Sequence, residues 1–174
     1  VTGYGTGGTV TGVARVLRAH SPKTKIVLSE PDVAPIVGSQ HIQERNENGE
    51  PTVSHPHFQP HPIQGWTPDF IPLVLQEAID KNLFDELLPV NGKDSIYWSK
   101  QLATKEGIFT GVSGGASLAV AMDVAKNAKN GSVILAMLPD TGERYLSTPL
   151  FDDIETEMSN EEIELSKSTP GFQM

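Results

Sequence analysis

Cysteine is absent from the 174 residues. This absence excludes a disulfide framework, a cysteine-based zinc finger, an iron–sulfur cluster and a thiol nucleophile. Long apolar runs are also missing, because no stretch approaches the roughly 18 to 20 residues that span a bilayer. No basic segment followed by an apolar core stands at the start of the chain, so we expect a cytoplasmic protein without a signal peptide.

Cations are scarce, since 13 Lys and Arg residues stand against 22 Asp and Glu residues and leave a net charge of −9. A field of that sign repels phosphate backbones and anionic lipids, so we expect neither a nucleic acid nor a membrane as partner. Hydrophobic residues make up 37% and charged residues 20% of the chain, which is typical of a globular protein. We expect one domain at 1–151, followed by an acidic C-terminal tail at 152–174.

The first residues are unusual, because Val1-Thr2-Gly3 leads directly into a glycine-rich loop without an initiator Met. Such a loop usually follows a strand of about five residues, and no room is left for one. We therefore expect that the N-terminal part of a longer protein precedes this chain.

Predicted strands and helices alternate along the chain. Apolar runs predict strands at 25–29, 86–90, 108–112 and 132–138, of which the last is the clearest. Residue spacing and capping signals predict helices at 11–20, 91–106 and 115–128, with a short helix after residue 69. Asn91 is expected to cap the second of these helices at its start and Gly107 at its end. The alternation indicates an α/β fold of three layers, with a mostly parallel sheet and helices on both faces.

Residues 31–68 lack periodicity and are punctuated by prolines, which indicates a functional loop, a lid or an insertion, with 38–60 unusually long. His55, His57 and His61 lie in this segment. They have no neighbouring carboxylates and no rigid frame, so we expect no metal site. Trp66 and Trp98 are interpreted as packing residues.

The first motif, Gly3-Tyr4-Gly5-Thr6-Gly7-Gly8, satisfies G-x-G-x-x-G and precedes a helix. Glu30 stands 22 residues later, where a dinucleotide-binding protein carries its ribose-binding acid, so a Rossmann module is one hypothesis. A phosphate site is the other, because glycines at a helix N-terminus present backbone N–H groups to an anion. The hydroxyls of Thr6, Thr9 and Thr11 favour a terminal phosphate, and a glycine-rich turn without a ligand remains a third interpretation.

The second motif, Gly111-Val112-Ser113-Gly114-Gly115, satisfies the G-x-S-x-G pattern of a nucleophile elbow. The hydrolase order requires a histidine after the serine, and all five histidines of this chain precede Ser113. A hydrolase is therefore a poor interpretation. Ser113 could cap the following helix, or its hydroxyl could face a bound ring, where it can donate or accept a hydrogen bond.

Taken together, the two turns resemble the C-terminal half of the cysteine synthase (O-acetylserine sulfhydrylase) family, to which cystathionine β-synthase is related. The resemblance covers residues 1 to about 151. It rests on Gly5-Thr6-Gly7-Gly8-Thr9 with Gly12, Ser29-Glu30-Pro31, His61-Pro62-Ile63-Gln64-Gly65 with Phe70-Ile71-Pro72, Gly111-Val112-Ser113-Gly114-Gly115-Ala116 and Leu138-Pro139-Asp140-Thr141-Gly142-Glu143-Arg144-Tyr145-Leu146-Ser147-Thr148. It implies the C-terminal portion of a tryptophan-synthase-β-like fold and pyridoxal 5'-phosphate as cofactor.

The resemblance also implies roles for particular residues. Gly5, Thr6, Gly7, Gly8 and Thr9 would hold the cofactor phosphate. Ser113 would hydrogen-bond the pyridine nitrogen, and Gly65 would belong to the loop on the substrate side. A neutral hydroxyl does not keep the pyridine nitrogen protonated as a carboxylate would. We therefore expect the cofactor ring to withdraw electrons less strongly than a full pyridinium.

The family's Schiff-base lysine lies in the N-terminal half, and none of the nine lysines here sits in its motif. The resemblance thus implies no catalytic residue in this chain, which is expected to be inactive alone. The activity implied is formation of L-cysteine from O-acetylserine and sulfide, by a homodimer in the full-length protein. Condensation of serine with homocysteine, as in cystathionine β-synthase, stays open, as do a Rossmann module and a catalytically silent partner domain. Trp66-Thr67-Pro68 replaces the family's glycine-rich continuation of the substrate loop, a departure on the side where the acceptor nucleophile would bind.

Overall fold

The computed structural model describes residues 1–168 and 171. Its sheet has three parallel strands in the order β1 (Thr2–Gly3), β2 (Val27–Pro31) and β3 (Glu86–Val90). β2 is central and every one of its residues is buried. The short β1 pairs with Leu28 and Ser29 of β2. The expectation that the glycine-rich loop has no strand before it is therefore wrong, because two residues are enough to join the sheet.

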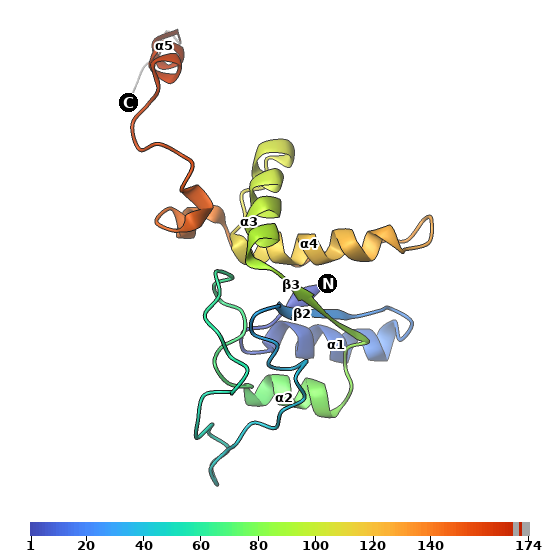
Figure 1. The fold of residues 1–174 in the computed structure, drawn as a ribbon. Coiled ribbons are helices and arrows are strands. Elements are labelled where there is room, and N and C mark those ends of the chain that lie inside the picture. Colours follow the sequence, from blue (N-terminus) through green and yellow to red (C-terminus); the bar gives the residue numbers. More distant parts are fainter. Residues whose placement is uncertain (169–170, 172–174) are drawn as a thin grey trace.

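Helices cover both faces of this sheet (Figure 1). On one side lie α1 (Gly8–His20) and α2 (Leu73–Asp80), and the core there includes Val10, Leu28 and Leu75. On the other side lie α3 (Gly92–Gln101) and α4 (Val112–Lys126), whose core includes Val90 and Ala116. The predicted α/β class, with a parallel sheet between two helical layers, is confirmed.

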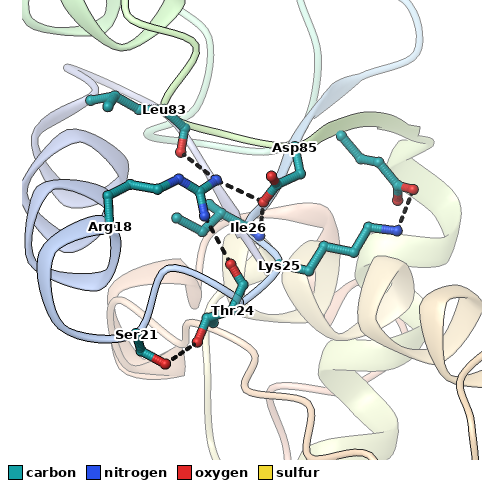
Figure 2. A network of polar contacts seen from close by, with 8 residues as sticks. Arg18, Ser21, Thr24, Lys25, Ile26, Leu83 and Asp85 are labelled. Carbon is teal, nitrogen blue, oxygen red and sulfur yellow. Dashed lines mark hydrogen bonds and ion pairs between the residues drawn. The ribbon is translucent and has the colours of Figure 1, made fainter.

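A polar network joins α1 to the strands at the edge where β2 and β3 begin (Figure 2). The Arg18 guanidinium donates to the carbonyl oxygens of Thr24 at 2.9 Å and Leu83 at 3.2 Å, and to Asp85 Oδ2 at 2.8 Å. The same Asp85 oxygen accepts the Ile26 N–H at 2.6 Å. The Arg18 side chain thereby holds the C-terminal end of α1 against the loop that leads into β2 and the loop that leads into β3.

The predicted strand at 132–138 is wrong. Within the described chain, two backbone hydrogen bonds join the segment to Val1, which precedes β1: the Val1 amino group donates to the Leu135 oxygen at 2.8 Å, and the Met137 N–H donates to the Val1 oxygen at 3.0 Å. Val133 is 96% exposed and Leu135 72% exposed. Apolar composition predicted burial, but nothing in the described chain covers these side chains.

The predicted strand at 108–112 is reduced to one antiparallel bridge between Thr110 and Thr141. α4 begins at Val112, three residues before its predicted start, and α1 also begins three residues early. In both cases glycines that suggested a loop lie in the first helical turn. α3 agrees with its prediction: Asn91 Oδ1 accepts the Asp94 N–H at 2.8 Å, a π-helical turn η1 (Leu102–Glu106) follows, and Gly107 ends it with φ of 67°.

Residues 32–71 contain no helix or strand beyond an isolated bridge between Arg45 and Pro51, so the predicted loop is confirmed. Side chains hold it in place. The Arg45 guanidinium donates to the carbonyl oxygens of Gly49, at 3.0 Å, and Ile71, and the Gln43 amide oxygen accepts the Ile71 N–H at 3.2 Å.

Two short 3-10 turns, η2 (Gly142–Tyr145) and η3 (Pro149–Phe151), precede α5 (Asn160–Ser168), which extends away from the sheet (Figure 1). None of the residues of α5 is buried. The remainder of the proposed tail, at 169–170 and 172–174, lies outside the described residues. None of the described helices is both long and apolar enough to cross a bilayer.

Candidate functional site

One cleft of about 340 Å³ brings the two glycine-rich turns together. Gly5, Thr6 and Thr9 line one wall, from the loop after β1 and the start of α1, and Ser113 lines the other, from the start of α4. The beginnings of two helices therefore meet at this cleft. Each carries a partial positive charge, and neither has an acidic residue in its first turn.

The start of α1 is suited to an anion. Gly7, with φ of 84°, is the N-cap residue and has no side chain to cap the helix. The Gly8 N–H reaches Thr6 Oγ1 at 3.3 Å, and the first backbone hydrogen bond of the helix runs from the Thr11 N–H to the Gly7 oxygen at 3.0 Å. The N–H groups of Thr9 and Val10 are consequently available to a ligand, as at any helix N-terminus.

Close contacts explain why two positions of this loop are occupied by glycine. A Cβ added to Gly7 would lie 2.7 Å from the backbone of Leu75 in α2, and one added to Gly5 would lie 2.4 Å from the Gly65 oxygen. Only glycine permits the left-handed conformation and the close approach at Gly7. The glycine-rich loop at residues 3–8 and the loop around Gly65 are thus in direct contact.

The α4 wall of the cleft carries two hydroxyls one helical turn apart, those of Ser113 and Ser117. Both residues are buried, at 2% and 1% exposure. Ser117 Oγ has no hydrogen-bond partner in the described chain. A buried hydroxyl without a partner costs free energy, which indicates that a ligand in the cleft would satisfy it.

Asp140 is the only charged side chain in the cleft lining of the described chain. Its Oδ2 accepts the hydroxyl proton of Tyr145, which also lines the cleft. Burial and this carboxylate raise the pKa of Tyr145 to about 12, and the Ser113 hydroxyl opposes the rise. The phenol therefore keeps its proton at neutral pH.

The remaining side of the cleft is formed by Gln64, Gly65 and Trp66. The indole of Trp66 is 8% exposed and packs on Gly3, where an added Cβ would lie 2.0 Å from the ring. The packing role predicted for Trp66 is accurate but incomplete, because the ring is also a wall of the cleft. Thr67 has φ of 40°, and its N–H donates to the Tyr4 oxygen at 2.7 Å.

Thr11 and Glu30, which the sequence proposed as ligand-binding residues, do not line the cleft. The Thr11 hydroxyl donates to the Val74 oxygen of α2 at 3.0 Å. Glu30 is 2% exposed and accepts hydrogen bonds from the Tyr4 hydroxyl at 2.8 Å and from the Val37 and Gly38 N–H groups at 2.9 Å each. Its carboxylate is therefore unavailable to a ribose, and the Rossmann interpretation is wrong.

The histidines lie away from the cleft. The rings of His41, His55 and His57 form a group with centroids 5.4 to 6.1 Å apart. No set of side chains within the described ranges has the geometry of a metal site. His61 is separate, with Nε2 3.3 Å from the Thr67 oxygen. No histidine lies beside Ser113 in the cleft lining of the described chain, which agrees with rejecting a hydrolase.

Ser117, Asp140 and Tyr145 are site residues that sequence reasoning missed. Ser117 could have been found from the sequence, because it follows Ser113 by four residues and residues four apart lie on the same face of a helix. Asp140 and Tyr145 stand in a quoted motif, but contacts between distant residues, among them the bridge between Thr110 and Thr141, bring that motif to the start of α4.

The geometry defines an α/β protein whose cleft suits a small, phosphate-bearing ligand. The pyridoxal-phosphate dependent enzyme family model matches residues 1–140. O-ureido-L-serine synthase of Streptomyces lavendulae is 43% identical over 155 residues, which are 89% of this chain and 42% of that protein. A cysteine synthase of Staphylococcus aureus is 37% identical over 155 residues, covering 88% of this chain and 44% of the relative.

Solved structures agree with these matches. The crystal structure of O-ureido-L-serine synthase has a TM-score of 0.76 and 39% identity, over 94% of this chain and 46% of that one. O-acetylserine sulfhydrylase isoform 3 from Entamoeba histolytica has a TM-score of 0.72 and 30% identity, over 91% and 42%. The chain belongs to the pyridoxal-phosphate dependent enzyme family, whose cofactor is pyridoxal phosphate, and it resembles cysteine synthases and O-ureido-L-serine synthase. It spans less than half the length of these relatives.

Proposed function

We propose that this chain forms the phosphate-binding and ring-binding part of a pyridoxal-phosphate enzyme that replaces the β-substituent of a serine-derived amino acid. The observation that carries the proposal is the meeting of the α1 N-terminus and Ser113 in one cleft. A phosphate at one end and a heteroaromatic nitrogen at the other match these two donor sets. The Ser117 hydroxyl on the α4 wall, which has no partner within the described chain, supports a polar occupant.

Each residue then has a defined task. Gly5, Thr6, Gly7, Gly8 and Thr9 bind the phosphate through backbone N–H groups and two hydroxyls. Gly7 and Gly8 do not line the cleft themselves, but they form the turn and the first helical residue that aim the other donors. Ser113 binds the pyridine nitrogen.

Gly65 and its neighbours form the substrate side, where the buried indole of Trp66 excludes water from one wall. When bound, pyridoxal phosphate withdraws electrons from the α-carbon of an amino acid, which lets the β-substituent leave. No lysine lines the cleft within the described chain. We place the imine-forming lysine outside these 174 residues, in keeping with the share of each relative that the chain covers.

The proposed binding is tested by calorimetry with two probes, inorganic phosphate and 4'-deoxypyridoxine 5'-phosphate, which lacks the aldehyde and needs no lysine. Thr9→Val removes a hydroxyl from the phosphate end and should weaken both probes about tenfold, the usual value of a hydrogen bond to a charged group. Ser113→Ala should weaken only the second probe. Thr52→Val, at an exposed position in the long loop, is the matched control. If neither probe binds the folded wild-type chain, the proposed function fails.

For the acceptor, we propose sulfide with O-acetylserine as donor, which makes the complete enzyme a cysteine synthase. One observation favours a second candidate, an oxygen nucleophile of the kind that yields O-ureido-L-serine, and it is the 43% identity to that synthase. A polypeptide that also carries the lysine should be given O-acetylserine with sulfide, hydroxyurea or homocysteine, and the amino acid product identified by mass spectrometry.

A further inference from the structure

The buried carboxylate of Glu30 holds the glycine-rich loop at residues 3–8 against the central strand of the sheet. Glu30 belongs to β2, which pairs with a strand on each side and has every residue buried. Its Oε2 accepts the Tyr4 hydroxyl at 2.8 Å, and its two oxygens accept the N–H groups of Val37 and Gly38 at 2.9 Å each. Three donors fix the orientation of the carboxylate, so the Tyr4 side chain is tied to a rigid part of the sheet.

This connection matters because the strand that leads into the glycine-rich loop is short. β1 has two residues, and its pairing with β2 ends at Gly3 and Ser29. Tyr4 and Glu30 directly follow these two residues, and their side chains continue the connection where the backbone pairing stops. Tyr4 is 2% exposed, and a hydrogen bond shielded from water in this way is electrostatically stronger than an exposed one.

The backbone of Tyr4 in turn holds the loop that forms the remaining side of the cleft. The Thr67 N–H donates to the Tyr4 oxygen at 2.7 Å. Thr67 has φ of 40°, which a β-branched residue rarely adopts, and the residue before a proline prefers an extended conformation. Such a conformation costs free energy and persists only where surrounding contacts offset the cost. The Tyr4 carbonyl is one of these contacts, and it keeps Trp66, the residue before Thr67, at the cleft.

We infer that Tyr4 and Glu30 are positioning residues that fix the glycine-rich loop relative to the loop at 64–67, so that a ring can be held between them. The inference rests on the proposed function, because it takes the ligand to have a phosphate at the start of α1 and a ring further into the cleft. The phosphate end uses backbone N–H groups whose arrangement is local to the helix N-terminus. Loss of the Tyr4 hydroxyl should therefore spare an ion that contacts only the glycine-rich loop, and weaken a ligand that needs both loops.

The test compares the affinities of inorganic phosphate and 4'-deoxypyridoxine 5'-phosphate by calorimetry. Tyr4→Phe keeps the aromatic ring and removes the hydroxyl. It should weaken the second probe about fivefold, within the range of one lost hydrogen bond, and change the affinity for phosphate by less than about twofold. Glu30→Gln should show the same pattern, and adding Tyr4→Phe to it should have little further effect, because both changes break one contact. Tyr97→Phe, at a side chain that is 53% exposed, is the matched control and should change neither affinity.

Fluorescence measures the position of the loop at 64–67 without any ligand. Trp66 and Trp98 are the two tryptophans of the chain, so a Trp98→Phe background leaves Trp66 as the one indole. Because Trp66 is 8% exposed, acrylamide should quench it weakly. Adding Tyr4→Phe should raise the quenching constant while circular dichroism remains that of the folded chain, and adding Tyr97→Phe should not.

The outcomes separate the inference from the proposed function. Equal weakening of both probes by Tyr4→Phe, or no weakening of either, overturns the inference and leaves the proposed function standing. An unchanged quenching constant in Tyr4→Phe also overturns it, because the loop has then kept its place without the hydroxyl. Failure of both probes to bind the folded wild-type chain overturns the proposed function and the inference with it.

Discussion

Replacing Gly115 with alanine should separate α3 from α4. A Cβ at this position would lie 2.0 Å from the Ser95 oxygen and 2.6 Å from the Ser99 nitrogen, and both atoms belong to the α3 backbone. Ordinary van der Waals contact begins near 3.4 Å, so the helices would have to move apart by roughly 1.4 Å at that contact. Overpacking a tight interior costs about 1 to 3 kcal/mol, and alanine regains about 1 kcal/mol of helix propensity.

We therefore expect Gly115→Ala to lower the free energy of unfolding by up to about 2 kcal/mol. Gly12→Ala is the matched control, because Gly12 is also helical but has nothing within 4 Å of an added Cβ. It should raise the free energy of unfolding by about 1 kcal/mol. The two variants should thus differ by about 1 to 3 kcal/mol, or about 0.5 M or more in urea midpoint, followed by circular dichroism. If Gly115→Ala unfolds at the same urea concentration as Gly12→Ala, the reasoning about the helix interface is wrong.

Three further predictions concern polar groups outside the cleft. Burial lowers the pKa of His55 below its ordinary 6.5, so the folded chain binds fewer protons than the unfolded chain, and thermal stability should fall as the pH drops below about 6.5. Arg18→Met removes three hydrogen bonds and should lower the free energy of unfolding by about 1 to 3 kcal/mol, measured by urea titration. Burial raises the pKa of Glu30, and its hydrogen bond from Tyr4 opposes that rise. The free energy of unfolding should therefore decline as the pH rises above about 4.5 through the raised pKa. Tyr4→Phe removes the opposing hydrogen bond and should steepen this decline, measured by thermal melts between pH 4 and 8.

Controls distinguish these effects from general damage. His57→Gln should leave most of the acid sensitivity in place, because His57 is exposed and contributes its N–H rather than its ring to His55 Nδ1. Tyr97→Phe, at a side chain that is 53% exposed, should leave stability unchanged. Affinity for inorganic phosphate should survive Arg18→Met, and a loss of phosphate binding there would contradict the separation of the Arg18 network from the cleft.

The place of the proposed phosphate-binding residues in the cleft could be predicted because their arrangement is local. Glycines followed by a helix with no acidic residue in its first turn favour an anion site. The place of Ser113 followed from its position at the start of a small-residue helix, while its proposed role comes from the resemblance alone. Both motifs lie in the same cleft, as the resemblance implied.

Other features depend on contacts between distant parts of the chain. Glu30 satisfied the spacing of a ribose-binding acid, but the Tyr4 hydroxyl and two N–H groups of a later turn occupy its carboxylate. The segment at 132–138 has the composition of a buried strand, yet within the described chain it hydrogen-bonds to Val1, before β1, and not to β1 itself. The position of Asp140 in the cleft lining depends on the bridge that brings its loop to α4, and no residue spacing encodes that bridge.

The hydrogen bond from the Thr67 N–H to the Tyr4 oxygen gives the protein an internal reporter. Tyr4 lies between the first two glycines of the glycine-rich turn, while Thr67 directly follows Trp66 in the loop that forms the remaining side of the cleft. Deuterium uptake at this single amide measures how often the turn and this loop separate. Because filling the cleft should hold the walls together, the exchange rate at Thr67 should slow in proportion to occupancy, even for a compound that has no colour and undergoes no reaction.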